Sequence, residues 1–386
     1  MRLKLLKALI MAVGLAGGVS RGEQQPTLNL SNLVAGLQQL QDKAATGDAA
    51  ASQAQKNVLR SIASTIESLG PELWNEKREK VAAAIYLLSG GSPAPLARTI
   101  TEEILNSEDG ALLRAGLAYA YGRQREAKPL FDRLDPNMMD KRVAGHFAYA
   151  YGELLSQDNE VEALKVFDLA RLLAPGGLVE EASLRHEIRI LGVIHDFDRF
   201  SFLSDQYIRR FKHSTYYENF VQSFLSGLEQ MVPNDDSPET IERLLTLANK
   251  LPAEDRRRAL LGMARVATVN VHPRAAKAFA GSVLQDASAP IAEQARARLY
   301  DAAARIVTGD SGQAASELQS LPSERLDRNQ SALLDAARKV AKDVTREPSI
   351  PESAEDTLKE NATINLAEEV LQRTAPLVSF PGQAPQ

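Results

Sequence analysis

The sequence predicts an all-α protein built as an irregular stack of helical hairpins, and three observations lead to this prediction. Apolar residues recur three or four positions apart along nearly the whole chain, as they do on one face of a helix, and β-branched runs are scarce. A five-residue pattern, Ala-Tyr-Ala-Tyr-Gly, occurs at 118–122 and again at 148–152. Five central residues also have the spacing of a tetratricopeptide-like hairpin: Phe147, Ala163, Phe167, Ala170 and Pro175.

The first 22 residues have the pattern of a signal peptide. Basic residues at Arg2, Lys4 and Lys7 accompany an apolar run from Leu5 to Leu15, and small residues follow where cleavage would occur. The run is shorter than the roughly 20 residues needed to span a bilayer. The alternative is the start of a buried helix. We therefore expect residues 1–22 to direct export and the mature chain to be soluble in the periplasm, with no membrane span.

Helices are expected next over 28–69, interrupted at Gly47, where Asp48 is available to cap the second helix. Pro71 is expected to start a helix that ends at the glycine pair 90–91, because glycine commonly terminates helices. A further helix is predicted from Ser92 to about residue 106.

The central third of the chain carries the repeated units. Each copy of the pentapeptide is followed by an alanine and a phenylalanine four positions apart, and a third, weaker unit covers 191–211. Small residues allow two helices to approach closely, and phenylalanine fills the adjoining groove. A single hairpin cannot bury its own apolar face, so neighbouring units must stack on it. The prediction is an irregular tetratricopeptide-like superhelix in which most phenylalanines, including those of the helix over 216–228, are core residues.

Two lobes and a tail complete the predicted organisation. The acidic turn 233–238 divides an N-terminal lobe (23–232) from a C-terminal lobe (233–345), although a single elongated array is also compatible with the length. The second lobe is expected to contain leaner helices, at 238–250, 252–269, 273–286, 289–308, 312–320 and 323–343. Residues 346–386 are rich in proline, serine and acidic residues and are predicted to be a disordered tail.

Composition argues against several classes of function. The chain has no cysteine, which excludes disulfides and thiolate chemistry, and its formal net charge of −5 argues against a nucleic-acid binder. The five histidines do not have zinc-binding spacing, and phosphate-binding and nucleophile-elbow motifs are absent. Adjacent carboxylates such as Glu180 and Glu181 are interpreted as solvated helix faces. We expect neither an enzyme nor a cofactor or metal.

The polar feature that most suggests function is a basic and aromatic cluster in an otherwise acidic protein. Such a cluster could receive an acidic protein partner. The alternative is a set of salt bridges to Glu187, Asp196, Asp198 and Asp205 at helical spacing. The candidate protein-binding residues are Arg185, Arg189, Arg199, Tyr207, Arg209, Arg210, Lys212 and Tyr216.

Three segments resemble a known family. The run from Leu172 to Ile188, together with 86–91 and 206–211, is similar to the periplasmic flagellar-motor protein family MotC of rhizobia and their relatives. The resemblance covers roughly residues 80–225. It departs from the family at Gly177 and His186, where threonine and arginine are expected.

The resemblance implies a non-enzymatic scaffold required for flagellar motility, which binds and stabilises the periplasmic part of the stator subunit MotB. It brings no catalytic residues to carry over. The alternative interpretation of the sequence is an exported helical-repeat adaptor that acts in envelope assembly.

Overall fold

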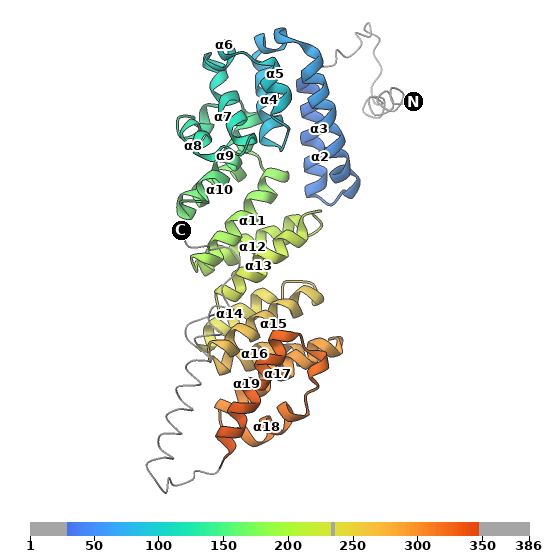
Figure 1. Ribbon diagram of the computed structural model, residues 1–386, viewed down its shortest axis with the longest axis vertical. Coiled ribbons are helices and arrows are strands. Elements are labelled where there is room, and N and C mark those ends of the chain that lie inside the picture. Colours follow the sequence, from blue (N-terminus) through green and yellow to red (C-terminus); the bar gives the residue numbers. More distant parts are fainter. Residues whose placement is uncertain (1–28, 233–235, 347–386) are drawn as a thin grey trace. The chain divides into compact units, whose positions relative to one another are not determined.

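The computed structural model describes residues 29–232 and 236–346. The regular secondary structure over these ranges is entirely helical, with turns and short extended segments between the helices (Figure 1). Eighteen α-helices and four short 3-10 helices occur in this part of the chain, without a strand. The all-α prediction is therefore confirmed. The predicted signal peptide 1–22 lies outside the described residues, as does the predicted tail apart from Arg346. No helix in the described ranges has both the length and the apolar character needed to cross a membrane.

The chain divides into two compact units, the first ending at Met263 and the second beginning at Ala264. This division falls within a helix, α15 (Ala253–Val269), and not at the acidic turn of residues 233–238. The lobe boundary expected from sequence stays a prediction, and each unit is described by itself.

The first unit begins with a helical hairpin, as expected. Asp48 caps the second of its helices by accepting a hydrogen bond from the Ala51 amide at 2.9 Å. The helix predicted from Pro71 instead starts as a 3-10 turn at 71–75. The prediction of one helix from Ser92 to about residue 106 is wrong, because two shorter helices occupy this segment. Ile100 and Thr101 are extended between them, and the Thr101 side chain caps the second. The helices here are α2 (Leu30–Ala45), α3 (Ala49–Leu69), α4 (Lys77–Leu88), α5 (Ala94–Thr99), α6 (Glu102–Leu105), α7 (Ala111–Ala120) and α8 (Gln124–Phe131).

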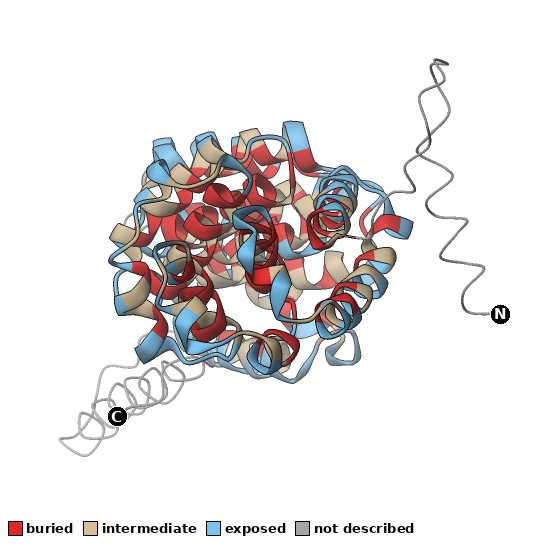
Figure 2. Cartoon of the chain, turned by 90° about the horizontal axis from the view of Figure 1, so that it is seen from above, coloured by how far each residue is buried: buried red, intermediate tan, exposed pale blue. Residues whose placement is uncertain are grey.

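The central hairpin pairs α9 (Lys141–Leu155) with α10 (Glu160–Leu173). The apolar residues that predicted it, Phe147, Ala163, Phe167 and Ala170, are all fully buried. Phe147 stacks on Phe131 of the preceding hairpin with ring centroids 4.6 Å apart. The phenylalanines therefore act as core wedges between successive hairpins, as expected. Figure 2 shows the buried residues on the helix faces that meet other helices.

Helix α2 departs from a simple array, because it contacts elements far along the chain. It packs against α4, α9 and the start of α11, whereas in a regular array each repeat touches only its neighbours. Its polar contacts are Ser31 with Glu79 of α4, Gln38 with Arg142 and His146 of α9, Asp42 with the Leu178 amide, and the Ala44 carbonyl with the Thr215 amide. The N-terminal hairpin thus joins α4 to the end of α12 within this unit.

The remaining helices of the first unit continue the stack. They are α11 (Leu178–Val193), α12 (Phe197–Phe211), α13 (Tyr217–Gln230), α14 (Pro238–Ala248) and α15 up to residue 263. Aromatic rings join α12 to α13, where Tyr207 lies 4.0 Å from Phe220 between centroids in a stacked arrangement. These helices, with the turn between α12 and α13, carry all the residues of the candidate site.

The second unit contains the end of α15, α16 (Pro273–Leu284), α17 (Ile291–Val307), α18 (Ser311–Ser320) and α19 (Arg328–Thr345). Each corresponds to a predicted helix. Ala295, Leu299, Ala302 and Ile306 form a buried stripe on α17. Helical spacing predicts that Ile291 belongs to the same stripe, but this residue is 62% exposed because it is the first residue of the helix. Arg305 joins α17 to α18 through Glu317.

The crossing of α11 and α13 gives the first testable prediction. A Cβ atom at Gly192 would lie 2.6 Å from the Cα atom of Gly227, closer than Cβ atoms approach other atoms in proteins. The two helix backbones therefore leave no room for a side chain at this position. Gly192→Ala should therefore lower the free energy of unfolding by about 1–3 kcal/mol, as overpacking does. Urea unfolding followed by circular dichroism measures this change.

Gly36 provides the matched control, because it lies within α2 and a Cβ there would meet nothing within 4 Å. Gly36→Ala should stabilise the chain by about 1 kcal/mol through helix propensity alone. A Gly192→Ala variant as stable as Gly36→Ala would contradict the proposed close approach.

Candidate protein-binding surface

The structure brings the eight predicted site residues together at α11, α12 and the turn that follows α12. Arg185 and Arg189 lie on α11, and Arg199, Tyr207, Arg209 and Arg210 lie on α12, while Lys212 and Tyr216 lie in the turn. They differ widely in exposure. Tyr207 is fully buried, and the Arg185 side chain is only 16% exposed, so neither is available to a partner. Whether the others bind a partner stays a prediction.

Glu181 explains why Arg185 and Tyr207 turn inward. Its carboxylate is fully buried and accepts hydrogen bonds from Arg185 Nε at 3.0 Å and from the Tyr207 hydroxyl at 2.5 Å. Ser214 Oγ lies 3.3 Å from the same carboxylate, and the Arg185 guanidinium lies over the Tyr216 ring. Burial, together with this carboxylate, raises the pKa of Tyr207, so its hydroxyl stays a donor. This cluster fixes the turn after α12 against α11.

Glu180 is the second buried carboxylate, with 2% of its side chain exposed. It forms an ion pair with Arg210 and accepts hydrogen bonds from Gln206 Nε2 at 3.0 Å and from the Gly176 amide at 2.6 Å. Interpreting Glu180 and Glu181 as a solvated face was therefore wrong. Both side chains are held inside by donors from α12, which local sequence cannot show.

The third buried carboxylate, Glu187, faces α10. Arg171 Nε lies 2.6 Å from Glu187 Oε2, and Arg171 also pairs with Asp168. Asp168 in turn meets Arg199 Nη2 of α12 at 3.0 Å. Burial raises the pKa of Glu187 to about 8, against the opposing effect of Arg171, and the nearby Asp168 carboxylate adds to the increase. Three helices thus share one charged network, which is buried at Glu187 and partly exposed at Asp168 and Arg199.

The salt-bridge interpretation holds for most of the candidate cations, but with other acids than those expected. Arg189 pairs with Glu160 at 3.0 Å, and only Arg209 pairs with an expected acid, Asp205, at 3.3 Å. Asp196 caps α12, and Asp198 pairs with Arg243 of α14. Lys212 has no ion-pair or hydrogen-bond partner within the described ranges.

The charge that this surface presents to solvent differs from the summed charge of its residues, because some of the charged side chains are buried. The three glutamates of α11 are at most 2% exposed, and Arg171 and Arg185, which pair with two of them, are 14% and 16% exposed. Arg210, which pairs with Glu180, and the neighbouring cations of α12 are more exposed. Arg199 is 43% exposed, Arg209 66% and Arg210 44%. We name Arg199, Arg209, Arg210 and Lys212 the basic α12 surface. Its positive character comes from Arg210, whose partner Glu180 is buried, and from Lys212, which has no paired acid in the described part of the chain. Asp168 and Asp205, the partners of Arg199 and Arg209, are 41% and 33% exposed.

Phe202 lies beside this surface, and the sequence reasoning missed it. Its side chain is 63% exposed. The opposite side of α12 buries three aromatic residues and one leucine, namely Phe200, Leu203, Tyr207 and Phe211. Phe202 is two residues from Phe200, and this spacing places it away from the apolar stripe. Plotting the residues around the helix axis would have singled it out.

A groove lies between α12 and α14 next to Phe202. It has a volume of about 470 Å³ and is lined by Phe197, Ser201 and Phe202 of α12 and by Glu242, Thr246 and Leu247 of α14. We name it the α12–α14 groove. It is bounded by the ion pair between Asp198 and Arg243, whose guanidinium stacks on Phe197 at 4.0 Å from the ring centroid.

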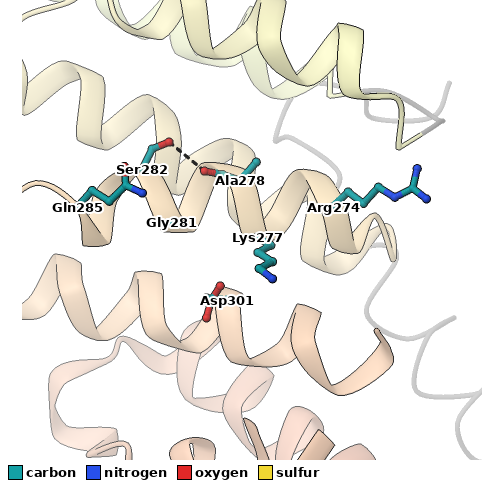
Figure 3. Close-up of a pocket in the computed structure, with 7 residues that line it drawn as sticks. All are labelled: Arg274, Lys277, Ala278, Gly281, Ser282, Gln285 and Asp301. Carbon is teal, nitrogen blue, oxygen red and sulfur yellow. Dashed lines mark hydrogen bonds between the residues drawn. The ribbon is translucent and has the colours of Figure 1, made fainter. Parts of the chain in front are cut away.

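The second unit has its own shallow hollow, shown in Figure 3. Lys277 and Asp301 project into the space between α16 and α17, while Arg274 points away along α16. The floor consists of small residues, Ala278, Gly281 and Ser282. Among residues 29–232 and 236–346, histidine and acidic side chains do not gather in any group of three that could hold a metal ion.

Comparison with known proteins gives two matches. A family model described as "Chemotaxis protein MotC" matches residues 1–383. A protein named chemotaxis protein MotC from Rhizobium meliloti (strain 1021) is 27% identical over 347 residues, which is 89% of this chain and 79% of that protein.

Glu187 gives a prediction about pH. Its pKa is about 8 in the folded chain and its ordinary value is 4.5, so between these pH values the folded chain holds a proton that the unfolded chain has released. The free energy of unfolding contributed by this group therefore falls as pH rises through the window. Glu187→Gln removes the titration. Relative to Glu187→Gln, the wild type should lose stability between about pH 5 and about pH 8.

Urea unfolding at the two pH values measures the effect. Glu126→Gln is the control, because the Glu126 carboxylate is 65% exposed on α8. This substitution should change the free energy of unfolding by the same amount at both pH values. If the gap between wild type and Glu187→Gln is the same at both pH values, Glu187 does not titrate as described.

Proposed function

The chain belongs to the MotC family of chemotaxis proteins, and from this premise we propose that it is a non-enzymatic periplasmic scaffold for flagellar motility. In this proposal it binds the periplasmic part of the stator subunit MotB and keeps it in working form. The observation that carries the proposal is the basic α12 surface. Exposed arginine heads held in place by Asp168 of α10 and by buried Glu180 of α11 offer a preorganised contact for an acidic protein surface.

The stacked hairpins support a binding role. Stacking of Phe167 on His186 joins α10 to α11, and ion pairs join Arg171 to Glu187 and Arg210 to Glu180. These contacts hold α10, α11 and α12 in fixed register, so the exposed side chains of the basic α12 surface keep defined positions. Rigid presentation reduces the entropy lost on association. Arginine is also among the residues that contribute most at protein interfaces.

A charge-reversal experiment tests the proposed contact. Arg209→Glu combined with Lys212→Glu should weaken binding to the purified periplasmic domain of MotB by about tenfold, because both cations are exposed and would become repulsive. Biolayer interferometry measures the dissociation constant. Arg210 is left unchanged, since its reversal would leave buried Glu180 without its cation and would disturb the fold.

Lys56→Glu serves as the matched control, because Lys56 is an exposed cation on α3, distant in sequence from the basic α12 surface. It should bind as the wild type does. Unchanged binding by a folded Arg209→Glu/Lys212→Glu variant would remove this surface as the stator contact.

Motility and location are tested in cells. Deletion of the gene should abolish spreading in soft agar, and the wild-type chain should restore it. Osmotic-shock fractionation should recover the protein with the periplasm, as the signal peptide expected at 1–22 requires. A deletion strain that swims normally would contradict the motility role and favour an adaptor in envelope assembly.

A further inference from the structure

We propose that the α12–α14 groove is a second interaction surface, which takes an amphipathic helix carrying apolar and basic side chains from another protein. The proposal does not rest on the proposed function. It concerns the side of α12 that faces α14, whereas Arg199 and Arg210 extend toward the acids of α10 and α11.

Phe202 gives the α12–α14 groove an exposed apolar rim. A phenylalanine that is 63% exposed on a helix with a complete buried face is not needed for packing. It lines an open groove whose floor contains Leu247, 2% exposed, and Phe197. Aromatic residues at the rim of a pocket are typical of interface positions that contribute strongly to binding.

The charges of the groove indicate what the partner carries. Arg243, the cation that lines the groove, is already paired with Asp198 and stacked on Phe197. The Glu242 carboxylate, in contrast, has no ion-pair or hydrogen-bond partner within the described part of the chain, and exposed Glu239 lies one turn before it. Asp198 itself is 88% exposed. The charge left to be matched is negative, so the partner should present lysine or arginine.

The shape favours a helix as the occupant. The groove runs between α12 and α14, which are joined by the Asp198–Arg243 ion pair. Two turns further along α12, Asp205 pairs at 2.8 Å with Lys250, just past the end of α14. Two helices side by side present ridges between which the side-chain ridge of a third helix packs. Its volume of about 470 Å³ lies in the range of binding clefts, ~300–1,000 Å³. A helix laid in such a groove is a known mode of peptide recognition.

A model peptide tests the proposal on the whole protein. The probe is a fluorescein-labelled amphipathic peptide of leucine and lysine, about 18 residues long so that it forms a helix. Fluorescence anisotropy should show saturable binding to the wild type. Phe202→Ala should weaken it about tenfold, and Glu242→Lys should weaken it and reduce its dependence on salt. Thr246→Trp, which fills the groove without altering Phe202, should also weaken binding.

Leu172→Ala is the matched control, because Leu172 is 77% exposed on α10 and does not line the groove. It should bind the peptide like the wild type, and a peptide of leucine and glutamate should bind much more weakly. The proposal is overturned if the wild type does not bind, if Phe202→Ala binds as Leu172→Ala does, or if the glutamate peptide binds equally well.

Discussion

Three carboxylates buried on α11 impose the constraint on which the centre of the first unit depends. Glu180, Glu181 and Glu187 are almost wholly removed from water, and a buried carboxylate without donors costs several kcal/mol. The groups that meet them come from α10, α11, α12 and the turn after α12: Arg171, Arg185, Gln206, Tyr207, Arg210 and Ser214. These helices can therefore slide past one another only by breaking buried pairs. Apolar packing alone would tolerate such shifts more readily.

The same constraint determines the charge that a partner meets. Because the glutamates of α11 lie inside while Arg199, Arg209 and Arg210 are exposed, this segment presents more positive charge to solvent than its residue count suggests. Asp168 and Asp205 remain partly exposed beside Arg199 and Arg209. Asp198 of α12 pairs with Arg243 of α14, and Asp205 pairs with Lys250, two residues past the end of α14. Asp205 also pairs with Arg209, so the basic α12 surface adjoins the α12–α14 groove, whose unmatched charge is negative. Net charge per segment, which is all that a sequence provides, does not distinguish these two surfaces.

Helical periodicity predicted the fold well because burial of an apolar stripe is a local property of each helix. Phe147, Phe167 and the cap at Asp48 lie where their spacing indicated. The burial of Glu180 and Glu181 could not be predicted in this way, because the α12 side chains that meet them, Gln206, Tyr207 and Arg210, lie 26 to 30 residues later in the chain. Only the Gly176 amide and Arg185 lie at local spacing. The long contacts of α2 depend on tertiary packing as well. Phe202 is different, because its position off the apolar stripe was visible in the sequence.

The course of α2 strengthens the case for contact at α12. In stacked helical hairpins the helix faces of successive units form the usual binding surface. Here α2 covers parts of α4, α9 and the start of α11, with Ser31, Gln38 and Asp42 bonded to them, so the chain itself occupies those faces (Figure 1). In contrast, Arg199, Arg209, Arg210 and Phe202 are 43–66% exposed, and Lys212 is exposed as well. A partner can bind only to side chains that are exposed to solvent in the unbound protein. We therefore infer that α12 is the helix of this unit best placed to contact a partner.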